Sequence, residues 1–250
     1  MRLRGAVVPH APVLLPEVAS RETETTSKRV RAALAGLDWE GVDVIVIVSP
    51  HGAATGVYAP ARTSLDELGV SGVDVSWPTD EDASAELARR WGQRQIHEPP
   101  DHGIAVPIAA GCASGKRVVA ATIEDVVASG GAVLERSLSA AAALADALRG
   151  LAEKRSVAVA ASAHTSAALS PRAPLTERAE ALATEERVLN GLRSDAGSLV
   201  DLARPLWVDG GACGVAALSV FGHLFAGRGA DVVLYECPVG IGYIVASATR

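Results

Sequence analysis

One run of β-branched residues, at positions 42–48, constrains the fold of this chain more than any other stretch. Every position of the run except Asp43 is Val or Ile, and Ser-Pro-His-Gly follows at once. A short apolar run bounded by Pro and Gly is typical of a strand that is buried on both faces of a sheet. In open α/β sheets, ligands bind just past the carboxyl ends of such strands. His51 therefore lies where a functional residue is expected.

Three further histidines stand in similar places. His10 follows an apolar run at 3–9 and is flanked by Pro9 and Pro12, and His164 follows the apolar run 156–162. His102 stands in a Pro-Pro-Asp-His-Gly turn that enters an apolar run. The pattern predicts that strand ends deliver several imidazoles to one edge of a sheet.

The other two histidines have a different context. His97 lies at the polar end of an expected helix, and His223 lies inside an apolar helix. A structural role is expected for both.

Strand and helix patterns alternate along the whole chain, which indicates an α/β fold. Residues 52–78 are rich in Gly, Pro, Ser and Asp, and they predict a long functional loop with short strands. No linker, repeat or low-complexity tract divides the sequence. We therefore expect a single domain over 1–250, an α/β sandwich with a central, mostly parallel or mixed sheet flanked by helices. Strands are expected at 3–9, 42–48, 117–123, 156–162, 232–235 and 241–245, and helices at 21–37, 80–91, 132–149, 175–193 and 211–226.

Composition excludes several classes of function. The net charge of −6 argues against binding to nucleic acid, whose phosphates attract basic surfaces. No apolar run approaches the ~18–20 residues that span a membrane, and no signal-peptide pattern precedes the first strand. The expected location is the cytoplasm. Cys112, Cys213 and Cys237 form no Cys-x-x-Cys pair, which argues against a disulfide framework or a structural zinc site.

The histidine set suggests chemistry of two kinds. Neutral imidazole binds iron, zinc or copper, and its pKa of about 6.5 suits proton transfer at neutral pH. Two histidines and a carboxylate on one face of a metal leave the other face open, the arrangement of non-haem Fe(II) oxygenases. Composition and spacing alone indicate a histidine-rich site at the strand ends and leave open whether it holds a metal.

Four motifs carry a resemblance to a known family. They are Pro-His-Ala-Pro at 9–12, Ser-Pro-His-Gly at 49–52, Asp-His-Gly with Val-Pro-Ile at 101–108, and Ala-Ser-Ala-His at 161–164. In this order they resemble the class III extradiol ring-cleaving dioxygenases, specifically the catalytic LigB-type subunit, whose superfamily includes the MEMO proteins. Each motif is short, and the resemblance runs from residue 6 to about residue 245.

The resemblance implies roles for particular residues. His10 and His51 match the two metal-binding histidines, with Fe(II) as the expected ion and zinc or another divalent metal as alternatives. His164 matches the catalytic acid/base. His102 matches a histidine that lines the substrate pocket.

The third ligand departs from the family pattern. The family uses a glutamate at the start of a late helix, and the corresponding region of this chain, before residue 211, has none. Asp209 is the first candidate, although an Asp there also fits a helix N-cap. Glu236 is an alternative, and Cys213 or Cys237 is a third.

The resemblance also implies a function. The expected activity is Fe(II)-dependent cleavage of a catechol-type aromatic ring beside its diol, with O2 as co-substrate. The missing glutamate favours an alternative, a MEMO-like metal-binding protein without ring-cleavage activity. Relatives that assemble suggest a homo-oligomer.

Overall fold

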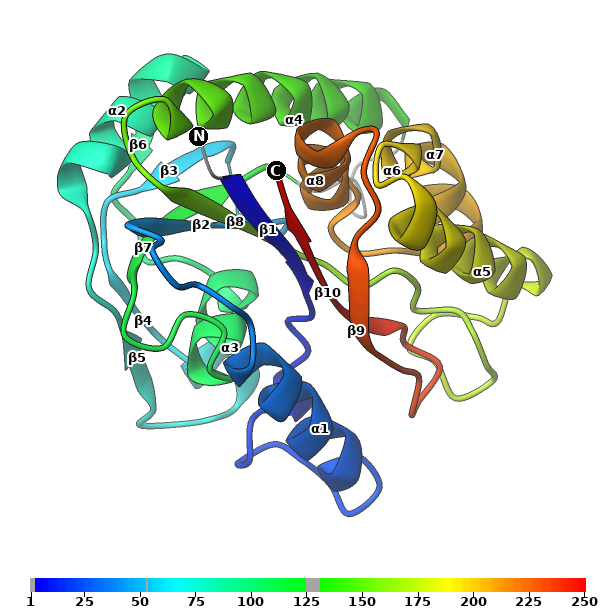
Figure 1. Cartoon of the computed structure of the whole chain (residues 1–250). Coiled ribbons are helices and arrows are strands. Elements are labelled where there is room, and N and C mark those ends of the chain that lie inside the picture. Colours follow the sequence, from blue (N-terminus) through cyan, green and yellow to red (C-terminus); the bar gives the residue numbers. More distant parts are fainter. Residues whose placement is uncertain (1–2, 53, 125–130) are drawn as a thin grey trace.

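An eight-stranded mixed sheet forms the centre of the chain in the computed structural model, which describes residues 3–52, 54–124 and 131–250 (Figure 1). Its strands are β1 (Leu3–Val8), β2 (Val44–Ser49), β3 (Gly56–Tyr58), β6 (Gln95–Ile96), β7 (Arg117–Thr122), β8 (Val157–Ser162), β9 (Asp231–Glu236) and β10 (Tyr243–Thr249). Their spatial order is β6-β3-β7-β2-β8-β1-β10-β9. The strands β7, β2, β8 and β1 are parallel. Next to β1, β10 is antiparallel to β1, and β9 is antiparallel to β10. The expected α/β architecture with a central mixed sheet is confirmed.

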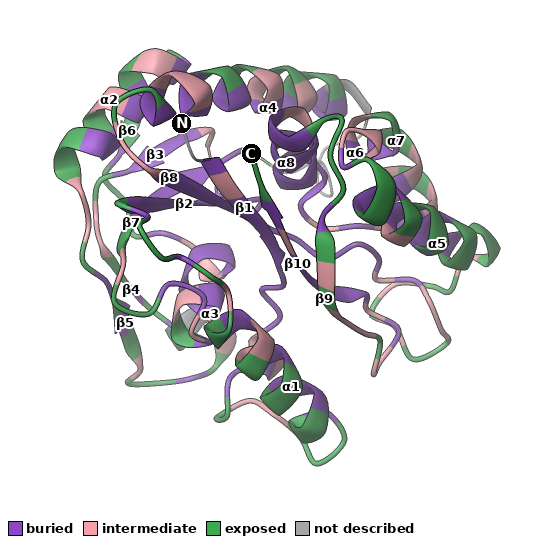
Figure 2. Cartoon of the chain, in the orientation of Figure 1, coloured by how far each residue is buried: buried purple, intermediate pink, exposed green. Residues whose placement is uncertain are grey.

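The parallel strands owe their central place to their apolar residues. Every residue of β2 and β8 is buried, and Figure 2 shows these strands inside the molecule. When a strand is covered on both faces, the side chains on both faces are removed from water. Apolar residues are then favoured along the whole strand, which explains the continuous runs of Val, Ile and Ala.

Helices cover both faces of the sheet (Figure 1). One face carries α2 (Glu81–Trp91), α4 (Gly131–Ala152), α5 (Ala179–Ser194), α6 (Ser198–Asp201), α7 (Ala203–Pro205) and α8 (Val215–Phe225). The other carries α1 (Glu24–Ala35), α3 (His102–Ala109), the short η1 (Pro12–Leu14) and η2 (Asp66–Leu68) turns, and the small sheet β4 (Arg62–Ser64)–β5 (Asp74–Ser76). Two apolar cores result, one on each side of the sheet. Among the described helices, none is both long and apolar enough to cross a membrane.

The helix expected at 80–91 shows how local sequence sets an element. Asp80 is its N-cap, and its Oδ1 accepts a hydrogen bond from Ala83 N at 2.9 Å. Gly92 ends the helix in the left-handed region, with φ of 69°. Both ends therefore satisfy backbone groups that a helix otherwise leaves unpaired.

The segment after Pro99 and Pro100 differs from the expected turn, because it becomes the helix α3. Asp101 caps this helix, and its Oδ1 accepts from Gly103 N at 2.7 Å. Gly103 and Pro107 lie inside the helix and weaken the helical signal in the sequence.

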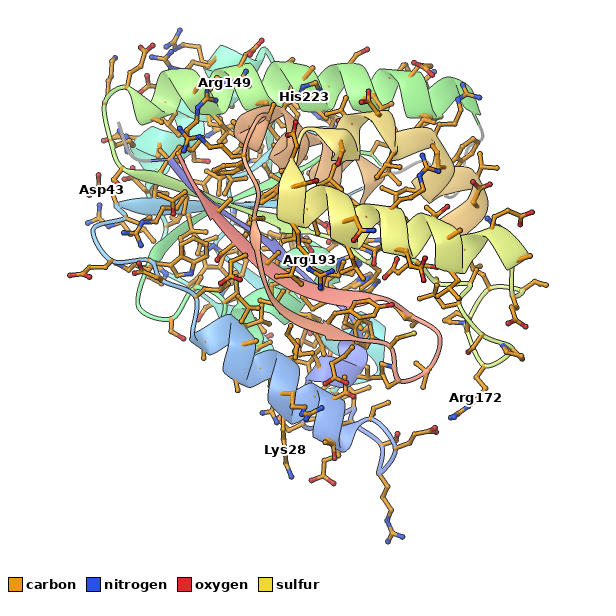
Figure 3. All side chains as sticks on the ribbon, turned by 45° about the vertical axis from the view of Figure 1, so that its right-hand side comes forward. Lys28, Asp43, Arg149, Arg172, Arg193 and His223 are labelled. Carbon is orange, nitrogen blue, oxygen red and sulfur yellow. The ribbon has the colours of Figure 1, made fainter. Side chains whose placement is uncertain are left out.

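His223 lies in the helical layer, on α8, beside Arg149 of α4 (Figure 3). Arg149 Nη2 donates a hydrogen bond to the backbone carbonyl of His223. His97 is exposed between β6 and α3. Neither residue belongs to a group of converging ligand atoms among the described residues.

Candidate metal centre

Three histidines reach one edge of the sheet because three neighbouring parallel strands end there. In the register of the sheet, Val8 of β1 pairs with Ser162 of β8, and Val48 of β2 pairs with Ala161 of β8. Each histidine comes two residues after its strand: His10 after β1, His51 after β2 and His164 after β8. Equal offsets from strands in register bring the three imidazoles together.

The ligand atoms of His10, His51 and Cys213 converge. The Nε2 atoms of the two histidines are 3.0 Å apart, and Cys213 Sγ lies 3.5 Å from His10 Nε2 and 3.1 Å from His51 Nε2. A tetrahedral ion with ordinary bond lengths to nitrogen and sulfur holds such atoms roughly 3.4–3.6 Å apart. Small adjustments would therefore let all three atoms share one cation.

Cys213 is held in place by backbone contacts with the segment that carries His164. His164 N donates to Cys213 O at 2.8 Å, and Cys213 N donates to His164 O at 3.2 Å. Gly214 follows with φ of 98° and serves as the N-cap of α8. A side chain there would meet the backbone of Ala163, so Gly214 permits the close approach of the two segments.

His102 and His164 flank this set. The His102 ring centroid lies 4.1 Å from that of His51, and the His164 ring centroid lies 4.0 Å from that of His10. The potential ligand groups within the described ranges are His10–His51–His102 and His10–His164–Cys213. Four imidazoles and one thiol thus form two groups of ligand atoms that share His10, and these groups could hold a metal ion.

Burial keeps the imidazoles of His10, His51 and His164 neutral. Burial, followed by the charge of neighbouring histidines, lowers the pKa of His51 to about 4 and that of His164 to about 3, and Asp101 opposes part of the shift at His51. The pKa of His10 is also well below its usual value, chiefly through burial and then through His164 and His51. At neutral pH their lone pairs are available to a cation.

A cavity of about 470 Å³ opens beside the cluster. His51 and His102 are among the residues that line it. Tyr58 OH on its wall donates to Asp101 Oδ2 at 3.2 Å. Its other lining residues are Gly52, Ala54, Thr63, Ser64, Leu68, Arg94, Ile96, Glu98, Pro99 and Pro100. A ligand as large as a substituted aromatic ring could reach the imidazoles from this side.

The third metal ligand predicted from the sequence, Asp209, does not lie with the two histidines in a ligand group of the described residues. Asp209 lies in a π-helical turn, η3 (Leu206–Gly210), and is neither in a ligand group nor the N-cap of α8. Glu236 is also outside the ligand groups and instead pairs with Arg29 at 2.8 Å. Cys213, the third possibility considered, lies against the histidines, because α8 starts at Val215 and not near Gly211. The positive φ values of Gly211 and Gly214 end the preceding turn and delay the helix.

The remaining cysteines lie elsewhere. None of the three cysteines forms a disulfide in the described part of the chain; Cys112 is buried and Cys237 is exposed. Neither belongs to a ligand group among the residues described above.

Comparisons with known proteins support the fold. No protein-family model matches the chain, and no curated protein matches it. Among solved structures, the chain is similar to the crystal structure of the uncharacterized protein JW3007 from Escherichia coli K12. The TM-score is 0.58 at 15% identity, and the match covers 98% of each chain. The likeness extends over the α/β fold as a whole.

Proposed function

We propose that this chain is a metal-dependent extradiol dioxygenase, acting on a catechol-type aromatic substrate with O2. One observation carries the proposal: the ligand atoms of His10, His51 and Cys213 lie within 3.5 Å of one another. His164 packs against His10, and His51 and His102 line the adjoining cavity. The resemblance of the four sequence motifs to the LigB-type subunit supports the same reading. When bound, an Fe(II) ion would supply a chelation point for the diol and redox chemistry with dioxygen.

The residues of the chain would have separate roles in the reaction. His164 is neutral and buried, so it can accept a proton from a substrate hydroxyl. An anionic substrate oxygen beside it would raise its pKa from the low value of the ligand-free site, because an opposite charge favours imidazolium. His102 lies on the cavity side of His51, where it can contact the ring. The cavity walls orient the substrate and limit its contact with water.

Cys213 favours a second candidate function. Thiolate is a soft ligand that suits zinc or Cu(I), whereas the Fe(II) oxygenases use a carboxylate. On this reading the chain is a MEMO-like metal-binding protein in which the same three residues bind a metal without ring cleavage.

Metal analysis combined with oxygen uptake separates these functions. Protein purified without oxygen is assayed for bound iron, zinc and copper, and then for O2 consumption on a panel of catechols. The dioxygenase proposal expects iron and O2 uptake with ring opening; stoichiometric zinc or copper with no uptake supports the second candidate.

Variants assign the roles of the histidines. His10→Ala and His51→Ala should each lose the metal, because two ligands bind far more weakly than three. His164→Gln should keep the metal and lose turnover by roughly 10²–10⁴-fold, the usual effect of removing an acid/base. Full metal occupancy in both alanine variants contradicts the proposed centre.

A further inference from the structure

The first turn of α3 forms hydrogen bonds with the ends of β2 and β8, the strands that precede His51 and His164. Asp101, the N-cap of α3, bonds to β2, and Gly103, in the first turn, bonds to β8. Their contacts reach Ser49, just before His51, and Ser162, just before His164.

The contact to Ser162 determines which nitrogen of His10 carries the proton. Ser162 Oγ lies 2.6 Å from Gly103 O and 2.9 Å from His10 Nδ1. A carbonyl only accepts, so the single hydroxyl proton of Ser162 is donated to Gly103 O. Ser162 Oγ must then accept from His10, which places a proton on Nδ1 and leaves a lone pair on Nε2. That lone pair is the one directed at His51 and Cys213.

The contact to Ser49 holds the turn that carries His51. Ser49 Oγ donates to Asp101 Oδ1 at 2.6 Å and accepts from His51 N at 3.1 Å. Asp101 Oδ1 also accepts from Gly103 N at 2.7 Å. Asp101 Oδ1 thus caps α3 and, through Ser49, holds the backbone of His51 in place.

We propose that the first turn of α3 orients both histidine ligands of the centre, His10 through Ser162 and His51 through Ser49. This inference rests on the metal centre proposed above. Asp101, Ser49 and Ser162 are then positioning residues, since they act on a metal through the ligands. Partners of metal-ligating histidines typically change metal affinity by about 10–100-fold when they are removed.

The first test is the tautomer of His10 in the metal-free full-length protein. Nitrogen NMR of protein with 15N-labelled histidine distinguishes Nδ1–H from Nε2–H, and the His10 signal is the one absent from His10→Gln. The wild type should show Nδ1–H, whereas Ser162→Ala should show a mixture of both tautomers. A protonated Nε2 in the wild type overturns the inference, and this result needs no variant at position 162 to fold.

The second test is Co²⁺ affinity, measured by titration and absorption. Ser162→Ala and Ser49→Ala should each bind Co²⁺ about 10-fold or more weakly than the wild type. Ser219→Ala is the matched control, because Ser219 is equally buried on α8 and its hydroxyl has no hydrogen-bond partner among the described residues. Wild-type affinity in both test variants, with the wild-type tautomer in Ser162→Ala, overturns the inference.

The two proposals can fail separately. If the wild type binds no metal while His10 is Nδ1-protonated, the centre is refuted and the orientation of His10 by Ser162 stands. If metal binds with His10 protonated on Nε2 in the metal-free state, the centre stands and the positioning role is refuted.

Discussion

At the scale of single residues, Cys213 would set the metal preference of the proposed centre. Its Sγ lies 3.1 Å from His51 Nε2, whereas a two-histidine Fe(II) oxygenase site has a carboxylate as its third ligand. Cys213→Asp converts the thiolate site into a two-histidine, one-carboxylate site. We expect this variant to bind zinc more weakly and to gain iron relative to zinc, because carboxylate is a harder ligand than thiolate. Competition between Fe²⁺ and Zn²⁺, read by metal analysis under anaerobic conditions, measures the change.

The control for this exchange is Cys237→Asp, since Cys237 is an exposed free cysteine outside the ligand groups. It should leave the ratio of iron to zinc at the wild-type value. An unchanged ratio in Cys213→Asp as well shows that Cys213 is not a ligand.

At the scale of elements, Gly103 couples the stability of α3 to the geometry of the proposed metal centre. A Gly to Ala exchange inside a helix ordinarily stabilises it by about 0.5–1 kcal/mol. At position 103, however, a Cβ would collide with Ser49 Oγ and crowd Asp101 Oδ1 at 2.9 Å. We therefore expect Gly103→Ala to lower the thermal midpoint and to weaken metal binding together. Calorimetry and a Co²⁺ titration measure the two effects.

Gly150→Ala in α4 provides the comparison. There the added Cβ meets the end of the flexible Arg90 side chain, which can move aside. The exchange should leave metal affinity unchanged. Equal behaviour of the two variants would show that the tight packing around Gly103 does not matter to the site.

The elements also show what the sequence could and could not predict. The run 42–48 predicted the central strand, and the strand-end histidines follow from parallel strands in register, which a sequence pattern can reveal. The third ligand could not be found in the same way. Its place depends on where α8 begins, and two glycines with positive φ, Gly211 and Gly214, shift that start to Val215. Such backbone turns depend on tertiary contacts with residues 162–166 and leave little local signal.

At the scale of the whole molecule, one buried carboxyl links stability to pH. Glu185 of α5 is 1% exposed, and its Oε1 accepts from Thr165 Oγ1 at 2.6 Å. Burial raises the pKa of Glu185 from 4.5 to about 7, and its hydrogen bonds offset only part of this effect. The folded state therefore holds a proton that the unfolded chain releases between these values. Because the unfolded state binds fewer protons in that window, stability falls as pH rises through it.

Glu185→Gln should remove this dependence. The shift from 4.5 to about 7 corresponds to about 3 kcal/mol, present as stabilisation below pH 4.5 and lost by the time pH exceeds 7. Urea unfolding at intervals from pH 5 to 8 should show a free energy of unfolding that declines in the wild type and stays flatter in Glu185→Gln. Glu186→Gln, one position along the same helix and exposed, should follow the wild type. Parallel curves for wild type and Glu185→Gln would mean that Glu185 is ionised in the folded protein at pH 5, with its charge balanced inside the sheet–helix interface.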